Sequence, residues 1–271
     1  MITLTPRQLF TVPIDAECIS PNIFAEKTAS EIAHLPVWEG NRQKTLGELF
    51  KMTHQKAPVE NPTIWISGDV GKVRRIGAKM TSGKIIVEGN AGMHLGEEMR
   101  GGTINVTGNV GSWAGCMMKN GTIEVMGNAG DYIGAAYRGS TLGMKGGTIT
   151  IRGDAGNEVG CFMRKGLIRI HGNAGQFAGI HMKNGAIHIK GNSEGRLGAQ
   201  MLGGKIVLCG HIPSVLPTFT IEDVKPNVKI DGERIEGPFY MFLGDLAENG
   251  NGRLYLSQKQ NTHLETYETL L

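Results

Sequence analysis

Residues 89–107, GNAGMHLGEEMRGGTINVT, and residues 108–126, GNVGSWAGCMMKNGTIEVM, share one arrangement of glycines, a central methionine and an alternating ending. From Gly89 to Gly191 this arrangement returns every 19 residues, except for one step of 26 that contains an insertion. A fixed period of this length is the signature of a repeat protein, in which each unit packs on the next. The glycine motif begins at Gly68, Gly89, Gly108, Gly127, Gly153, Gly172 and Gly191.

The ending of each unit alternates between apolar and polar side chains, which is typical of a half-buried strand. In residues 103–107, Ile104 and Val106 are expected to point inward. A β unit of 19 residues cannot bury its own apolar face, so equivalent strands are expected to pair in parallel along a stack. The sequence therefore predicts an all-β fold, a right-handed parallel β-helix (solenoid) of about seven 19-residue coils, because a left-handed hexapeptide helix needs a multiple of six.

Stacking would place equivalent residues in columns along the axis. A column of seven methionines is expected at a corner, where a flexible thioether fills an uneven space. Its members are Met80, Met99, Met118, Met144, Met163, Met182 and Met201. The Asn or Asp after each first glycine, from Asp69 to Asn192, is expected to adopt a left-handed backbone or to form an amide ladder. The two inward columns are Ile85, Ile104, Ile123, Ile149, Ile168, Ile187, Ile206 and Val87, Val106, Val125, Ile151, Ile170, Ile189, Leu208.

The two ends lack the repeat and are expected to cap the coils, because an open end would expose unpaired strand edges. The predicted division is a small mixed α/β cap at 1–60, the repeats at 61–211 and a C-terminal extension with a β-hairpin at 212–271. The expected elements are an edge strand at 2–6, short helices at 28–35 and 44–52 opened by capping threonines, and hairpin strands at 239–246 and 252–258.

Composition narrows the class of protein. The chain has 271 residues, of which 41 are glycine and 6% aromatic, without the every-third-residue glycine of collagen. A net charge of +3 predicts no nucleic-acid partner. The chain shows neither an export leader nor 18 consecutive apolar residues, which predicts no membrane contact. Four scattered cysteines predict reduced thiols in a cytoplasmic protein.

None of the usual catalytic motifs is expected to act here. The GNAG motif recurs at fixed spacing, so it is interpreted as structural and not as a phosphate loop. His171 and His188 are placed on the outward strand face, where a solvated or partner-facing role is favoured over metal binding. Glu97 falls in a column that Cys116 and Cys161 share, and this column is expected to face inward. The sequence predicts no catalytic, cofactor-binding or metal-binding residue.

Basic residues suggest a docking surface for an acidic partner. One basic residue follows the methionine in each of five coils, and the outward strand face changes from acidic in the early coils to basic in the later ones. The inserted loop that begins at Ala135 is a second candidate contact. The predicted interface residues are Arg100, Lys119, Lys145, Arg164 and Lys183, then Arg152, Arg169 and Lys190, then Tyr137 and Arg138.

The glycine repeat resembles the C-terminal β-helix domain of glutamate synthase. The flanks are more specific: SPNIF (20–24), VWEGN (37–41), LGELF (46–50) and FLGDLAENGNGRLYL (242–256) make the whole chain resemble the C subunit of formylmethanofuran dehydrogenase. This resemblance implies a complex that reduces CO2 to formate at a molybdenum or tungsten pterin and condenses formate with methanofuran at a binuclear metal site, the first step of methanogenesis from CO2. It places those sites, and iron–sulfur clusters, in partner subunits: a pterin-metal subunit, an amidohydrolase-like subunit and iron–sulfur subunits.

The resemblance implies a scaffold subunit without catalytic residues of its own, and two alternatives stay open. The C subunit of a bacterial formyltransferase/hydrolase complex would share this architecture, and a stand-alone glutamate synthase-like domain fits the flanks less well. A carbohydrate-acting β-helix enzyme would need clustered carboxylates on one outward face. The outward columns carry mostly Thr, Arg, His and Lys instead.

Overall fold

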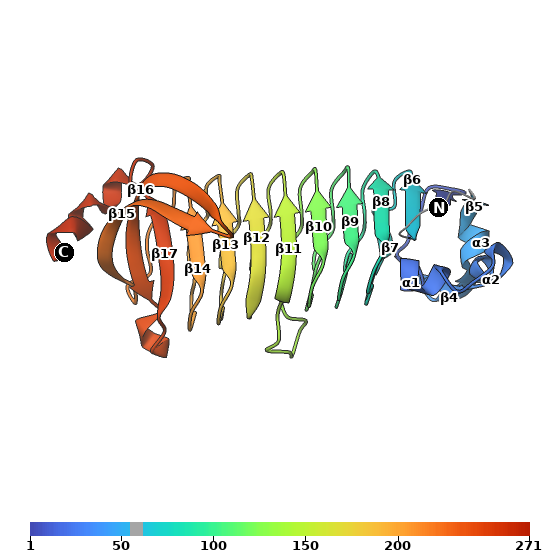
Figure 1. Cartoon of the computed structure of the whole chain (residues 1–271), viewed down its shortest axis with the longest axis horizontal. Coiled ribbons are helices and arrows are strands. Elements are labelled where there is room, and N and C mark those ends of the chain that lie inside the picture. The colour runs from blue at the N-terminus through green and yellow to red at the C-terminus, as the bar shows by residue number, and fades with distance from the viewer. Residues whose placement is uncertain (55–61) are drawn as a thin grey trace.

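The computed structural model describes residues 1–54 and 62–271. The chain is mostly β and forms an elongated row of strands with a different structure at each end (Figure 1). The boundary predicted between residues 60 and 61 lies outside the described residues. Within the described residues, no helix is both long enough and apolar enough to cross a membrane.

One strand from each repeat unit contributes to a large sheet. Neighbouring strands pair in parallel, and Ile85, Ile104 and Ile123 are direct partners, as predicted. The pairing continues across the longer step, because Ile123 pairs with Ile149. The strands in this row are β6 (Thr63–Ser67), β8 (Lys84–Glu88), β9 (Thr103–Val106), β10 (Thr122–Val125), β11 (Lys145–Ile151), β12 (Lys165–Ile170), β13 (Ala186–Ile189) and β14 (Lys205–Leu208).

A second row of parallel contacts links the same units. Single bridges join Val70 to Ala91, Ala91 to Val110, and so on to Ser193. Each unit therefore pairs with its neighbour at two places. The two predicted aliphatic columns and the seven methionines of the predicted column are buried and belong to one apolar core.

The polar residue after each first glycine does form a ladder, but not the predicted one. Oδ1 of Asn90 accepts a hydrogen bond from the backbone N–H of Asn109 (2.9 Å), one unit later, so the ladder joins a side chain to the backbone. The left-handed backbone prediction for this column was wrong. Positive φ angles occur instead at outward corner residues such as His94 (61°) and Trp113 (62°).

The N-terminal end extends the large sheet and adds a small second sheet. Strand β1 (Ile2–Pro6) pairs with both β6 and β5 (Phe50–His54), so the predicted edge strand lies inside the sheet and β5 forms the edge. The second sheet contains β2 (Ile14–Asp15), β3 (Pro36–Glu39), β4 (Arg42–Thr45) and β7 (Val73–Arg74).

Three short helices complete this end: α1 (Pro21–Phe24), α2 (Ala29–Ala33) and α3 (Leu46–Leu49). The helix predicted at 28–35 and its capping Thr28 are confirmed, whereas the helix predicted at 44–52 is present only at its centre. In α2, Glu31 accepts a hydrogen bond from the N–H of Thr28 (2.7 Å) and donates its own N–H to the Thr28 hydroxyl (3.3 Å). The second predicted helix is one turn long, because the chain turns into β5 at Phe50.

The C-terminal end contains the predicted hairpin and one strand that was not predicted. Strands β16 (Glu233–Gly244) and β17 (Gly252–Ser257) are antiparallel, and β17 continues the main row by pairing in parallel with β14. Strand β15 (Thr220–Ile230) pairs with β16 to form a long ribbon. Two 3-10 helices follow β16 and β17, at Leu246–Glu248 and Thr262–Leu270.

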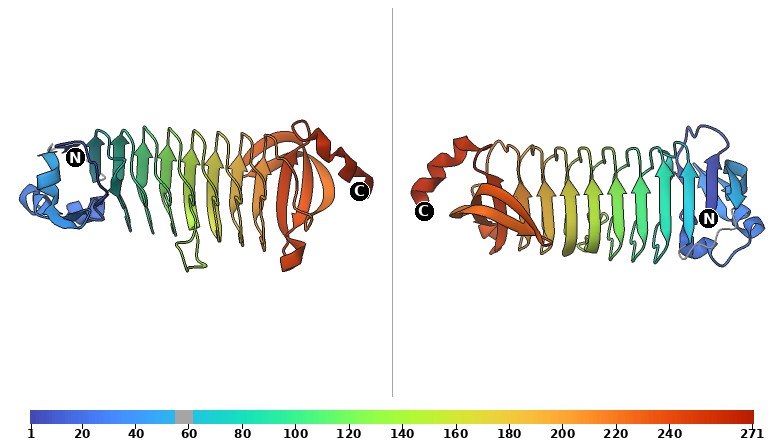
Figure 2. Two further views of the ribbon diagram at one scale, coloured as in Figure 1. Left: turned by 180° about the vertical axis from the view of Figure 1, so that it is seen from behind. Right: turned by 45° about the horizontal axis from the view of Figure 1, so that its top comes forward.

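The ribbon of β15 and β16 folds back over the outer face of the last units (Figure 2). Val228, Ile230 and Phe239 of the ribbon pack against Leu167 and Val207 of the row in a second, smaller apolar cluster. The outer face of β12 to β14 is therefore largely covered.

Candidate partner interface

The five basic residues that follow the methionines lie one above another along one edge of the row, and we call them the basic ladder (Arg100, Lys119, Lys145, Arg164 and Lys183). The backbone fixes this alignment. The N–H of each residue donates to the carbonyl of the methionine in the preceding unit, for example Lys119 to Met99 (2.7 Å) and Lys183 to Met163 (2.8 Å). The ladder ends at Leu202, whose side chain is exposed.

Members of the basic ladder differ in their partners. Lys119 lies 3.6 Å from a carboxylate oxygen of Glu98. Arg164 is half-buried, and its Nη2 donates to the carbonyl of Thr141 in the inserted loop (3.4 Å). Arg100, Lys145 and Lys183 are exposed and form no ion pair within the described residues. These three cations have the most freedom to meet an external partner.

On the outward strand face, two of the predicted interface residues already have acidic partners. Nη2 of Arg152 lies 2.6 Å from Oε1 of Glu124. Nη2 of Arg169 lies 3.7 Å from the carboxylates of both Asp231 and Glu233 at the tip of the ribbon. The third basic residue of this group, Lys190, is exposed.

The interpretation of His188 as a solvated or partner-facing residue was wrong. Its side chain points outward from β13, but the ribbon covers it and leaves it only 2% exposed. Burial, followed by the charge of Lys190, lowers the pKa of His188 to about 4. Its Nε2 lies 3.5 Å from Sγ of Cys209. The sequence could not show this, because the covering ribbon comes from residues 220–244.

The inserted loop presents Tyr137 and Arg138 at the surface, and Figure 1 shows it projecting at the start of β11. The Arg138 guanidinium lies 5.5 Å from the ring centroid of Trp113, which stacks on Tyr132 at 4.5 Å. A cavity of ≈ 240 Å³ separates the loop from the units below. Sequence reasoning missed this aromatic stack, although His94, Trp113 and Tyr132 occupy equivalent positions of successive repeats.

Glu97 does not point into the core as expected. Its carboxylate lies 3.3 Å from Nε of Arg75 and 3.5 Å from Nδ1 of His94 at an outer corner. The hydrogen bond from His94 lowers the pKa of Glu97. Cys116 and Cys161 of the same column are buried, and burial raises the pKa of each thiol to about 12.

The part of the chain that the structure describes contains cysteines and candidate metal ligands. All four cysteines are free. Across residues 1–54 and 62–271, no three or more His, Cys, Asp or Glu side chains are close enough together to hold a metal ion.

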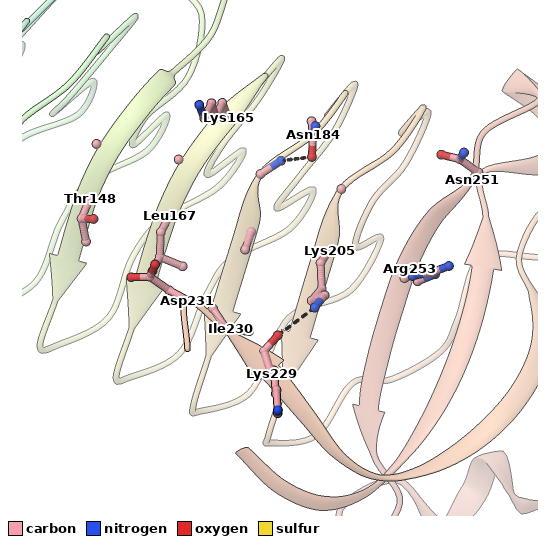
Figure 3. A pocket seen from close by; sticks show the side chains of 15 residues that line it. Thr148, Lys165, Leu167, Asn184, Lys205, Lys229, Ile230, Asp231, Asn251 and Arg253 are labelled. Carbon is pink, nitrogen blue, oxygen red and sulfur yellow. Dashed lines mark hydrogen bonds between the residues drawn. The ribbon is translucent and has the colours of Figure 1, made fainter. Parts of the chain in front are cut away.

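A second surface feature lies where the ribbon tip meets the row, and we call it the ribbon cleft. It is a cavity of ≈ 710 Å³ between the outer face of β11 to β14 and the end of β15 (Figure 3). Sequence reasoning missed it because it forms only when the ribbon folds back. Its charged lining residues are Lys165, Lys205, Lys229, Asp231 and Arg253.

Comparisons with known proteins identify relatives along nearly the whole chain, although no family model matches it. The chain is 50% identical over 261 residues to the C subunit of the tungsten-containing formylmethanofuran dehydrogenase 2 of Methanococcus maripaludis, which covers 94% of this chain and 95% of that protein. It is 39% identical over 95 residues to the C subunit of the molybdenum-containing formylmethanofuran dehydrogenase 1 of Methanosarcina barkeri, covering 35% of this chain and 32% of that protein.

A solved structure of a complex also contains a chain that is similar to this one. A chain of the formyltransferase/hydrolase complex (FhcABCD) from Methylorubrum extorquens, determined in complex with methylofuran, superimposes with a TM-score of 0.83. It is 30% identical, and the match covers 94% of this chain and 99% of that one. With half of its residues identical along almost the full length of the Methanococcus maripaludis protein, the chain belongs to the family of formylmethanofuran dehydrogenase C subunits.

Proposed function

We propose that this chain is a non-catalytic structural subunit of a formylmethanofuran dehydrogenase complex. The observation that carries this proposal is the 50% identity to the Methanococcus maripaludis C subunit over 94% of the chain. In the proposed complex, CO2 is reduced to formate and formate is condensed with methanofuran in other subunits. This chain holds the pterin-metal subunit and the amidohydrolase-like subunit in a fixed relation.

The proposed architecture suits a scaffold. The 19-residue units form a right-handed parallel β-helix of seven coils at 61–211, with caps at 1–60 and 212–271. Support comes from the two rows of parallel contacts between consecutive units. A stack paired at two places per unit resists bending, so it can keep two partners at a constant distance. The likeness of the repeat to the β-helix domain of glutamate synthase stays a prediction.

The proposed docking surface is the edge that carries the basic ladder and the inserted loop. Arg100, Lys145 and Lys183 are exposed and without an ion pair within the described residues, which favours an acidic partner surface. Tyr137 and Arg138 extend this edge, since Arg164 of the ladder is bonded to the same loop. Arg152 and Arg169 would contribute less, because each already faces a carboxylate of this chain.

The cofactors of the proposed complex belong to its other subunits: a molybdenum or tungsten pterin, iron–sulfur clusters and a binuclear metal site. The names of the relatives support the metals of the complex, since one contains tungsten and another molybdenum. We also propose a cytoplasmic location. Four free thiols, three of them with a pKa raised to about 12 by burial, are consistent with a reducing compartment.

A second candidate is the C subunit of a bacterial formyltransferase/hydrolase complex. It is supported by the likeness to a chain of the Methylorubrum extorquens complex, with a TM-score of 0.83. The lower identity of 30% to that chain, against 50% to the Methanococcus maripaludis protein, favours the dehydrogenase.

Native purification through a tag on this chain tests both candidates. Companion proteins are identified by mass spectrometry, and metals are measured in the same sample. Molybdenum or tungsten together with iron–sulfur subunits supports the dehydrogenase. A formyltransferase and an amidohydrolase without either metal support the bacterial complex. Catalytic activity of the chain purified alone would overturn the scaffold proposal.

A further inference from the structure

The ribbon cleft gathers positive charge from three strands. Lys165 comes from β12, Lys205 from β14 and Arg253 from β17, whereas Lys229 of β15 turns its backbone carbonyl to the floor and its side chain away from it (Figure 3). Among the described lining residues the single acid is Asp231. Its carboxylate lies 3.7 Å from Nη2 of Arg169, so it offers little neutralisation to the three cations.

Lys205 shows how strongly the cleft concentrates charge. Its Nζ donates to the carbonyl of Lys229 (2.7 Å) and lies 5.8 Å from the ring centroid of Tyr255. Burial and then the charge of Arg253 lower the pKa of Lys205. An ammonium that is held by a carbonyl, crowded by another cation and partly desolvated is stabilised by an incoming carboxylate.

The shape of the cleft fits an extended chain. Its floor is made of small residues, including Gly166, Gly185 and Ala186, and it follows the row from β11 to β17. These five strands are separated by four spacings of about 4.8 Å, so the floor is about 19 Å long, enough for roughly six residues of extended peptide. No aromatic residue is among the described residues that line the cleft, which disfavours stacked nucleic-acid bases.

We infer that the ribbon cleft binds an extended segment rich in Asp and Glu from a partner subunit. Its carboxylates face Lys165 and Arg253, and Lys205 contributes from the floor. Lys165 directly follows Arg164 of the basic ladder in the sequence, so the cleft begins next to the ladder. This inference rests on the proposed subunit function.

A peptide-binding experiment tests the cleft on the full chain. The probe is a fluorescein-labelled hexapeptide of alternating Asp and Glu, followed by anisotropy at low and moderate salt. The double variant Lys165→Glu/Arg253→Glu is expected to weaken binding of the acidic peptide by roughly tenfold or more, and added salt should weaken its binding to the native chain in the same way. The matched control, Lys72→Glu/Lys259→Glu, makes an equal change in charge at exposed positions outside the cleft. Its affinity for the acidic peptide should stay within about twofold of the native value.

Three results would overturn the inference: no saturable binding of the acidic peptide, equal weakening in both double variants, or tighter binding of oligothymidylate or inorganic phosphate to the same residues. An Asn and Gln hexapeptide of equal length should not bind.

A second experiment separates failure of the cleft from failure of the subunit function. A photo-crosslinking amino acid replaces Asn184, an exposed and uncharged residue that lines the cleft, in the tagged chain, and the complex is purified before irradiation. A crosslinked partner peptide rich in Asp and Glu supports the inference. If the complex assembles and no acidic partner peptide is crosslinked, the cleft inference fails and the subunit function stands. If no partner subunits are purified, the subunit function itself fails.

Discussion

The backbone N–H of Asn128 donates to Oδ1 of Asn109, one unit earlier in the stack, across 2.7 Å. The same bond recurs in consecutive units, and each time a backbone N–H donates to the Oδ1 atom of the residue one unit earlier. The further donors and acceptors are Asp154 to Asn128, Asn173 to Asp154, Asn192 to Asn173 and His211 to Asn192. These bonds form an Asn/Asp ladder that holds the bends of successive units at a fixed spacing.

Replacing Asn109 by alanine should lower the free energy of unfolding by about 1 kcal/mol, because the N–H of Asn128 loses its acceptor in the protein. Asn109→Asp should be milder, since Asp154 already serves as an acceptor at the equivalent position. Urea unfolding followed by circular dichroism measures both. Asn120→Ala is the control, because the exposed Asn120 side chain is outside the ladder. Equal losses in Asn109→Ala and Asn120→Ala would contradict the structural importance of the ladder.

In six successive units, from Gly77 to Gly179, the glycine equivalent to Gly96 lies directly against an isoleucine side chain of the core. Gly96 has a φ of 62°, and a Cβ there would lie 2.7 Å from Cδ1 of Ile123. Gly96→Ala should therefore destabilise the fold by about 2–4 kcal/mol, through overpacking and a left-handed backbone. Gly139 also has a positive φ, but a Cβ there would meet no atom within 4 Å. Gly139→Ala should therefore lower the free energy of unfolding by only about 1 kcal/mol.

Removing the clashing methyl group checks this explanation. The double variant Gly96→Ala/Ile123→Val should be less destabilised than the sum of its two single variants, because valine lacks the Cδ1 atom. A double-mutant cycle from chemical denaturation measures the coupling. Strict additivity would show that the contact with Ile123 is not the cause.

Much of the row of strands could be predicted from the sequence, because the two-residue alternation and the 19-residue repeat can both be read along the chain. Alternation identifies the inward side chains of Ile104 and Val106, and the 19-residue spacing identifies their partners in the next unit. The core that these residues form is the one observed. Such reasoning requires no knowledge of distant contacts.

Long-range contacts explain what was missed. Strand β15 contains Pro226 and several charged residues, so its sequence alone does not indicate a strand, and it is stabilised by pairing with β16. The burial of His188 and the ribbon cleft both depend on this ribbon. The aromatic stack of Trp113 on Tyr132 was missed for a different reason. Trp113 adopts a positive φ that is unusual for a bulky residue.

The buried His188 should make the fold sensitive to acid. Its pKa is lowered to about 4 in the folded chain, against an ordinary value of 6.5, so the unfolded chain binds the proton more tightly. The stability that this difference provides is complete above pH 6.5 and is lost as the pH falls towards 4. The loss reaches about 3 kcal/mol, because one pKa unit corresponds to about 1.4 kcal/mol.

The measurement is the free energy of unfolding in urea at several pH values between 7.5 and 4.5. His188→Val should flatten this profile, since Val207 fills the equivalent position of the next unit. His54→Val, at an exposed histidine of β5, is the matched control. If His188→Val keeps the full pH dependence, another group is responsible.

The exposed part of the basic ladder should determine how strongly partner subunits bind. The triple variant Arg100→Glu/Lys145→Glu/Lys183→Glu reverses three cations that form no ion pair within the described residues, so the fold should be preserved. Repulsion from an acidic partner surface should then reduce the co-purified partner subunits by roughly tenfold, and added salt should reduce the difference from the native chain. The control Lys27→Glu/Lys72→Glu/Lys259→Glu makes the same charge change at exposed positions away from the ladder. Because the two variants have equal net charge, an equal loss of partner subunits in both would show that net charge matters and that the position of the basic ladder does not.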